Sequence, residues 1–159
     1  MFNLVLFEPE IPPNTGNLIR LAANMGAQLH LIEPLGFSLD IKAVRRAGLD
    51  YHDLTRVRTY ANAEACLSEL TTADTQLFAC TTKGEVTHVD AKYQEGDILL
   101  FGPETRGLPE SLRNDSRVTA RLRLPMCEGN RSLNLANAVS IVGYEAWRHI
   151  GFKGATNLD

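Results

Sequence analysis

Cysteine, histidine motifs and long apolar runs are scarce in this chain, and each scarcity excludes a class of protein or site. The three cysteines, Cys66, Cys80 and Cys127, are odd in number and widely spaced, so they fit neither a disulfide framework nor a paired zinc motif. The four histidines show no metal-binding spacing, and we expect no catalytic metal. No apolar run approaches the roughly 20 residues of a membrane span. The N-terminal residues lack the features of a secretion signal. We therefore expect a cytoplasmic protein without a membrane partner.

The remaining composition is that of an ordinary globular protein, with 44% hydrophobic and 22% charged residues. Short apolar runs predict strands at residues 2–7, 29–32, 54–57, 76–80, 98–101 and 118–124. Helical spacing predicts helices at residues 14–25, 41–47, 61–70 and 133–150. This alternation indicates an α/β fold: a single domain with a mainly parallel sheet and helices on both faces. We expect the domain to span residues 1–151 and the tail 152–159 to be frayed.

Positive charge is concentrated in two segments, although the whole chain carries a net charge of −3. Residues 42–58 and residues 113–131 each hold five basic and two acidic side chains, whereas residues 61–97 hold seven acids and two lysines. The two basic segments predict a phosphate-binding face if the fold brings them together. The alternative is that they are solvated helix and strand surfaces, which charge alone favours.

The loop at residues 102–109 has the highest density of glycine and proline. Its two glycines are spaced like the start of a P-loop, but Leu108 and Pro109 stand where lysine and serine or threonine are required. No dinucleotide fingerprint follows any strand. Gly102 and Gly107 would let the backbone approach a flat ligand, and Glu104 could accept hydrogen bonds. A purely structural turn explains the loop equally well. Ligands of open α/β sheets bind at the carboxyl ends of strands, a position expected for three loops, at residues 8–15, 102–109 and 125–132.

Two helix starts carry unusual polar residues. Asn14 suits the N-cap of the first helix. Arg20 follows near that helix start, where a cation opposes the helix dipole, so helix stability does not account for it. Ser132 suits the N-cap of the last helix, and Asn134 and Asn137 lie on one face beyond it, although asparagine is a poor helix former. The alternatives are a solvated arginine and hydrogen bonding between helices.

The last helix also carries an apolar stripe that includes Val139, Val142 and Ala146. Burial in the core is the default interpretation of this stripe. Tyr144 and Trp147 on the same helix favour a homodimer contact, because aromatic side chains are enriched at such interfaces.

Three motifs together resemble one family. They are N-T-G-N-x-x-R at 14–20, L-L-F-G-P-E-T-R-G-L-P at 99–109, and R-L-P-M at 123–126 followed by R-S-L-N-L-A-N-A-V-S at 131–140. They resemble the motifs of the SPOUT methyltransferases, and among these the minimal tRNA (cytidine/uridine-34) 2′-O-methyltransferases. The likeness extends from residue 8 to residue 148.

The resemblance implies a trefoil knot in the C-terminal half, a homodimer, and a site near the subunit interface. It implies S-adenosylmethionine (SAM) as methyl donor and the wobble nucleotide of a tRNA anticodon stem-loop, of leucine isoacceptors, as substrate. Arg20 would take the proton of the 2′-hydroxyl or stabilise its developing charge; the second role is physically easier because a guanidinium stays protonated at neutral pH. The expected cofactor contacts are Cys80, Gly102, Glu104, Leu124 and Ser132.

Ser132 and Asn134 are expected to orient the methionine end of SAM and the ribose during catalysis. The basic segments would bind the stem phosphates, and the residues expected to do so are Arg45, Arg46, Arg121, Arg123 and Arg131. Three other functions stay open. They are a ribosomal RNA 2′-O-methyltransferase, a catalytically silent RNA-binding dimer, and a flavodoxin-like module that binds another nucleotide.

Overall fold

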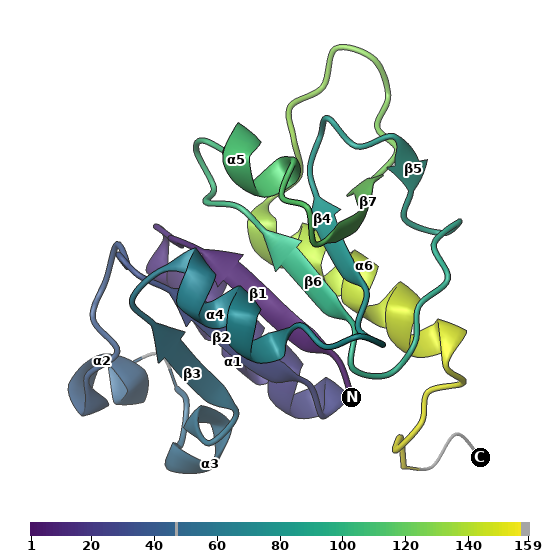
Figure 1. Ribbon diagram of the computed structural model, residues 1–159. Coiled ribbons are helices and arrows are strands. Elements are labelled where there is room, and N and C mark those ends of the chain that lie inside the picture. The colour runs from purple at the N-terminus through teal and green to yellow at the C-terminus, as the bar shows by residue number, and fades with distance from the viewer. Residues whose placement is uncertain (47, 157–159) are drawn as a thin grey trace.

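A single parallel sheet organises the molecule, which a computed structural model describes over residues 1–46 and 48–156 (Figure 1). Within these residues the sheet has seven strands in the order β3-β2-β1-β6-β4-β7-β5. Every pairing between neighbouring strands is parallel. The strands are β1 (Asn3–Phe7), β2 (Gln28–Ile32), β3 (Val57–Tyr60), β4 (Leu77–Cys80), β5 (Val86–Thr87), β6 (Ile98–Phe101) and β7 (Val118–Arg123).

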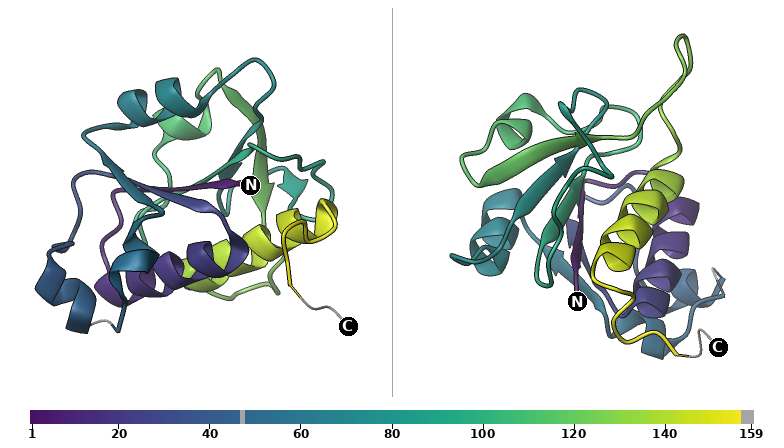
Figure 2. Two further views of the ribbon diagram at one scale, coloured as in Figure 1. Left: turned by 90° about the horizontal axis from the view of Figure 1, so that it is seen from below. Right: turned by 90° about the vertical axis from the view of Figure 1, so that its right-hand side faces the viewer.

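Helices cover both faces of this sheet, as the sequence predicts (Figure 2). The two longest, α1 and α6, lie side by side on one face, while α4 and α5 lie on the other. The short helices α2 and α3 lie beside the edge strand β3. The helices are α1 (Pro12–Met25), α2 (Ile41–Arg46), α3 (Tyr51–Leu54), α4 (Ala63–Leu70), α5 (Glu110–Arg113) and α6 (Leu135–His149).

Apolar residues on the two faces form two separate clusters. Leu18 and Ala22 of α1 and Val142 of α6 belong to the larger cluster, with Leu4 and Leu99 of the sheet. The apolar stripe predicted on the last helix is therefore buried in the core of the subunit. The second cluster joins α4 and α5 to the opposite face, and its members include Cys66, Leu67, Leu100 and Leu112.

Two predicted helix caps are wrong. Helix α1 begins at Pro12, whose fixed backbone suits the first helical position, and its N-cap is Ile11 rather than Asn14. Helix α6 has Asn134 as its N-cap rather than Ser132. The strand predicted at 54–57 is also misplaced, because α3 ends at Leu54 and β3 begins at Val57. The short elements β5 and α5 were not predicted.

The strands of the C-terminal half do not follow chain order in the sheet. Strand β4 lies between β6 and β7, so two later strands flank an earlier one. The trefoil knot and the domain boundary at residue 151 stay predictions. Residues 47 and 157–159, part of the predicted second helix and of the predicted tail, lie outside the described residues.

Strand β2 contains a buried titratable side chain, His30. His30 is 2% exposed, and its ring lies 3.1 Å from the Tyr60 hydroxyl through Nδ1 and 3.0 Å from Asn3 Oδ1 through Nε2. Burial, assisted by the charge of Arg58, lowers the pKa of His30 to about 4. The histidine is therefore neutral in the folded protein and takes up a proton in the unfolded chain as the pH falls below about 6.5.

We expect acid to destabilise the protein through this histidine. Its contribution is present above pH about 6.5 and is lost as the pH falls to about 4, which amounts to about 3 kcal/mol. Urea unfolding at several pH values should show this loss, and the variant His30→Gln should lack it. Parallel curves for the two proteins between pH 7 and pH 4 would contradict the prediction.

Candidate cofactor-binding site

A cavity of about 700 Å³ opens at the carboxyl ends of β4, β6 and β7. The segments that follow these three strands supply most of its wall, as expected for ligand sites of parallel sheets. The volume lies in the usual range for small-molecule sites. Apolar side chains of the wall include Phe101, Leu122, Leu124, Leu135 and Val142.

All five residues predicted to contact the cofactor line this cavity: Cys80, Gly102, Glu104, Leu124 and Ser132. Burial raises the pKa of the Cys80 thiol, so this side chain is neutral and offers the cavity an apolar contact. The structure thus brings the predicted residues to one place, and their contact with a cofactor stays a prediction.

The glycine at position 102 lets the loop after β6 fold back on itself. A β-carbon at this position would lie 2.2 Å from the backbone nitrogen of Leu108 and 2.3 Å from the carbonyl carbon of Gly107. No side chain fits at such distances without moving the backbone. The narrow turn therefore requires glycine, and it holds Pro103 and Glu104 against the cavity.

Glu104 connects the cavity loop to the start of α1. Its Oε2 accepts a hydrogen bond from Glu10 N at 2.8 Å, and its Oε1 accepts from Ile11 N at 3.0 Å. Oε1 also accepts from Asn14 Nδ2 at 3.2 Å. A helix N-terminus has unpaired amide groups, and here a carboxylate from a distant loop binds amides beside it. Glu104 therefore positions α1 relative to the cavity.

Asn14 extends this connection to α6. Its Oδ1 accepts a hydrogen bond from Asn134 Nδ2 at 2.9 Å, while Asn134 Oδ1 caps α6 by accepting from Ala136 N at 2.8 Å. The local sequence predicts only a capping role for Asn14, because its partners Glu104 and Asn134 lie 90 and 120 positions away. Because Asn14 is 5% exposed, hydrogen bonding fixes the orientation of its amide group. Asn134 does not line the cavity, although Ser132 and Leu135 on either side of it do.

A second set of contacts fastens the loop of residues 8–11 to the same cavity loop. Thr105 Oγ1 donates to Glu10 Oε2 at 2.8 Å, and Arg106 Nη2 lies 3.0 Å from Glu8 Oε2. Glu8 has a φ of 47°, in the left-handed region that strains an ordinary side chain. Strain of this kind persists where the surrounding contacts hold it, and the ion pair with Arg106 is one of them.

Arg20 lies outside the cavity of this chain. It is exposed on α1, and its Nη2 donates a hydrogen bond to Gly48 O at 2.7 Å. It is not among the residues that line the cavity. The fold of the chain therefore does not bring the predicted catalytic arginine to the predicted cofactor contacts.

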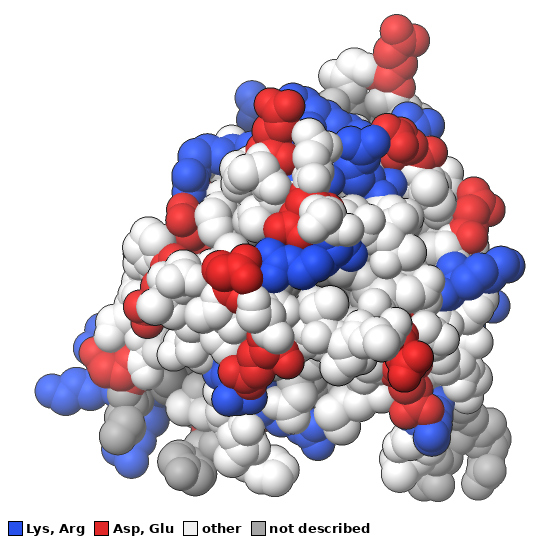
Figure 3. Space-filling view, viewed as in Figure 1, with Lys and Arg blue, Asp and Glu red and all other residues white. Residues whose placement is uncertain are grey.

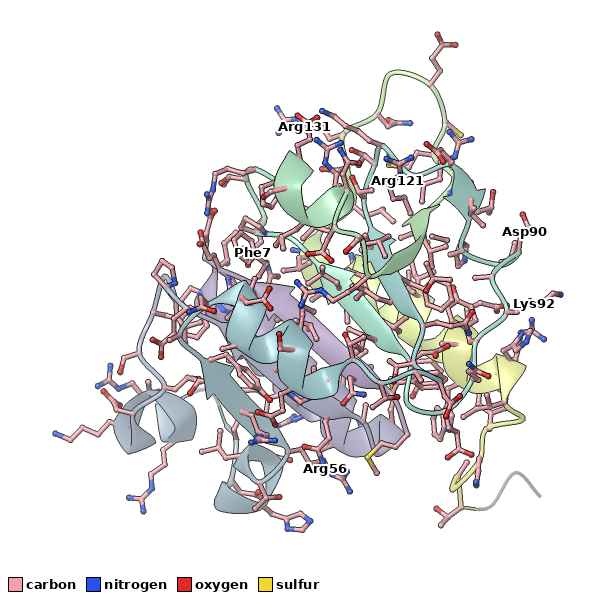
Figure 4. The ribbon with its side chains drawn as sticks, viewed as in Figure 1. Phe7, Arg56, Asp90, Lys92, Arg121 and Arg131 are labelled. Carbon is pink, nitrogen blue, oxygen red and sulfur yellow. The ribbon has the colours of Figure 1, made fainter. Side chains whose placement is uncertain are left out.

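The arginines predicted to bind RNA fall into two separate regions. Arg45 and Arg46 are exposed at the end of α2, beside the edge strand β3. Arg121, Arg123 and Arg131 lie at the opposite end, on β7 and on the loop that follows it (Figures 1 and 4). Basic and acidic side chains are interleaved at this end (Figure 3). One subunit does not unite the two basic segments.

The aromatic residues predicted for a dimer contact lie on the outer side of α6. Tyr144 is 44% exposed, and its ring centroid lies 5.6 Å from that of Trp147. The indole of Trp147 also packs on Phe152 and donates a hydrogen bond to Lys153 O at 3.0 Å. Ile141, one turn from Tyr144, is 42% exposed. This side of α6 therefore exposes two large apolar side chains, Ile141 and Tyr144, beside the polar residues Asn137 and Arg148.

No helix in the described part of the chain combines the length and hydropathy that a membrane crossing requires. Among residues 1–46 and 48–156, no group of three histidine, cysteine, aspartate or glutamate side chains is placed to hold a metal ion.

Known proteins resemble this chain over its whole length. The tRNA (cytidine(34)-2′-O)-methyltransferase of Escherichia coli (strain K12) is 54% identical over 159 residues, which are 100% of both chains. A solved structure described as giving structural insights into the 2-OH methylation of C/U34 on tRNA matches with a TM-score of 0.85 and 46% identity, over 95% of this chain and 97% of that one. An AdoMet-bound rRNA methyltransferase from Sinorhizobium meliloti matches with a TM-score of 0.79 and 28% identity, over 94% of this chain and 56% of that one.

These likenesses confirm the predicted α/β fold. They also confirm the resemblance to the SPOUT methyltransferases, which implies the cofactor contacts named above. The SpoU rRNA Methylase family model matches residues 1–144, which include β1 to β7 and most of α6. The chain belongs to the SpoU rRNA Methylase family.

Proposed function

We propose that this protein transfers the methyl group of SAM to the ribose 2′-oxygen of the wobble nucleotide, position 34, of tRNA. The observation that carries the proposal is the 54% identity, over the full length of both chains, to a tRNA (cytidine(34)-2′-O)-methyltransferase. The cavity supports it, because it gathers the five residues that the family resemblance implies as cofactor contacts. Cytidine and modified uridine in leucine tRNAs are the proposed target nucleotides, and the cytoplasm is the proposed compartment.

The cavity has the chemistry that SAM requires. Its apolar side chains suit an adenine ring, while the Ser132 hydroxyl and backbone groups of the loops at Gly102 and Leu124 suit the polar ends of the cofactor. SAM supplies the methyl group in an already activated form. The task of the protein is therefore to align the ribose 2′-oxygen with that group and to exclude water.

Arg20 is the residue we assign to the reacting oxygen. As the 2′-oxygen bonds to the methyl carbon, the bond between that carbon and the sulfur of the donor would break and the hydroxyl proton would pass to solvent. A guanidinium beside the oxygen would stabilise the negative charge that develops there. A protonated guanidinium suits this role better than the role of proton acceptor. Ser132 and Asn134 keep their proposed role in orienting the ribose and the methionine end of the cofactor, Asn134 acting through the start of α6.

A homodimer would explain why Arg20 does not line the cavity of its own chain. We propose that the outer surface of α6 with Tyr144 and Trp147, next to α1, packs against a second copy of the chain. Exposed apolar residues near this surface, Ile11 at 41% and Ile141 at 42%, support the proposal. In a two-fold dimer every contact is made twice, so an interface that brings Arg20 of one subunit to the cavity of its partner completes both sites, and this is the arrangement we propose.

Methyl transfer to defined RNAs tests the proposed function. The purified protein is incubated with SAM and, in separate reactions, with purified leucine tRNAs and with ribosomal RNA from cells that lack it, and nuclease fragments of each RNA are then analysed by mass spectrometry. We expect 2′-O-methylcytidine and a 2′-O-methylated uridine at position 34 of leucine tRNAs. Methylation of ribosomal RNA instead would support the rRNA alternative suggested by the family description, and no transfer to any RNA would support a silent RNA-binding dimer.

A further inference from the structure

Of the four basic residues that line the cavity, only Arg106 has an acidic partner among residues 1–46 and 48–156, whereas basic residues just outside the cavity are paired. Arg117 pairs with Glu64 and Asp115, and Arg121 pairs with Glu85. Neither arginine lines the cavity.

The cavity itself contains Lys83, which follows β4, Arg113 of α5 and Arg123 at the end of β7. Within residues 1–46 and 48–156 these three make no ion pair, although Arg113 Nε donates to Leu108 O at 3.1 Å. We call Lys83, Arg113 and Arg123 the basic wall. Its charge is available to a ligand.

The other charged residues of the lining leave this excess of positive charge in place. Glu104 uses its carboxylate for Glu10 N, Ile11 N and Asn14, and Arg106 is held by Glu8 and Glu10. Glu110, in the first turn of α5, is the remaining acid of the lining. One glutamate thus faces three cations. Unbalanced like charges around a cavity repel one another and attract an anion.

The cofactor does not provide the matching charge. SAM carries a sulfonium and an ammonium against one carboxylate, so its net charge is positive and the basic wall would repel it. RNA is a polyanion whose phosphates pair with lysine and arginine. Lys83 and Arg123 are exposed at the rim of the cavity, where RNA arrives from solvent, whereas Arg113 is half-buried.

From these observations, and resting on the proposed function, we propose that the basic wall binds the phosphodiester on the 3′ side of the target nucleotide and so orients its ribose. That phosphate is attached to the 3′-oxygen, next to the 2′-oxygen that accepts the methyl group. Holding the phosphate therefore restricts the position of the 2′-oxygen above the cofactor. We therefore add Lys83 and Arg113 to Arg123 as proposed RNA-positioning residues. We no longer propose RNA binding by Arg121, because its charge is paired with Glu85.

Salt-dependent RNA binding tests this assignment. Kd for a labelled anticodon stem-loop RNA is measured by fluorescence anisotropy from about 50 to 200 mM NaCl. The double variant Lys83→Gln/Arg123→Gln, which keeps the Arg113–Leu108 contact, should bind about 10-fold more weakly and lose about 1 to 2 from the slope of log Kd against log salt. Lys92→Gln is the matched control, because Lys92 is an exposed lysine outside the cavity (Figure 4). Its slope should equal that of the unsubstituted protein.

A second RNA identifies the phosphate. Replacing the linkage 3′ of nucleotide 34 by a neutral methylphosphonate should weaken binding to the unsubstituted protein about 10-fold and leave the double variant nearly unaffected. An unchanged salt slope, or equal sensitivity of both proteins to the methylphosphonate, would overturn the proposal. A loss of SAM affinity with normal RNA binding would also overturn it, since the basic wall would then serve the cofactor carboxylate. Failure of the unsubstituted protein to methylate RNA would overturn the proposed function instead. The salt slopes of the two proteins would still show whether the basic wall binds phosphate.

Discussion

The variant Arg20→Ala should lose methyl-transfer activity but still bind SAM. We expect kcat to fall by about 100- to 1000-fold, the usual cost of removing one group that stabilises developing charge. The affinity for SAM should stay within about twofold, because Arg20 is assigned to the ribose oxygen and is not among the proposed cofactor contacts. Single-turnover transfer of a labelled methyl group and calorimetric titration with SAM measure the two quantities separately.

A second arginine provides the matched control for this variant. Arg56 donates a hydrogen bond to a glycine carbonyl, Gly26 O at 3.1 Å, much as Arg20 donates to Gly48 O at 2.7 Å. Arg56→Ala removes the same kind of contact and should leave kcat within about twofold. Near-normal turnover of Arg20→Ala would remove Arg20 from the mechanism.

The variant Arg20→Lys separates the two chemical roles of the arginine. A lysine has an ordinary pKa of about 10.4, so it loses its charge at alkaline pH, whereas arginine does not. If positive charge is what the reaction needs, the activity of Arg20→Lys should fall as the pH rises through that range. If the residue is a proton acceptor, the activity should rise instead.

Much of the fold and the site follows from local sequence. The apolar runs before Cys80, Gly102 and Leu124 predict three strands, and ligands bind where such strands end. The structure accordingly places these three residues around one cavity. Strand β5 could not be predicted, because its two residues are too few to show a periodic pattern.

Contacts between distant segments could not be predicted in this way. Glu104 and Asn14 are 90 positions apart, and Asn14 and Asn134 are 120 positions apart. Local rules interpret Asn14 as a cap because asparagine commonly caps helices, yet Pro12 starts this helix earlier and leaves the amide free for Glu104 and Asn134. The order of β6, β4 and β7 is likewise a property of the whole chain.

The variant Gly102→Ala should lose SAM binding. The added β-carbon would lie 2.2 Å from the backbone nitrogen of Leu108, so the loop after β6 must open. We expect Kd for SAM to rise by about 100-fold or more, since displacing the loop breaks several contacts at once. Gly143→Ala is the control, because its β-carbon would meet only the flexible side chain of Met25 at 3.2 Å. SAM binding by Gly102→Ala within about threefold of normal would show that the loop does not hold the cofactor.

The two inactive variants, combined in one dimer, decide where Arg20 acts. Arg20→Ala keeps an intact cavity and Gly102→Ala keeps an intact arginine, so a mixed dimer contains one complete site only if the arginine serves its partner. Random exchange makes about half of the dimers mixed, each with one of its two sites complete, and should restore about a quarter of normal activity. Differently tagged subunits and tandem purification confirm the exchange. A purified mixed dimer without activity would mean that Arg20 reaches the cavity of its own subunit, which requires α1 or the segment at Gly48 to move.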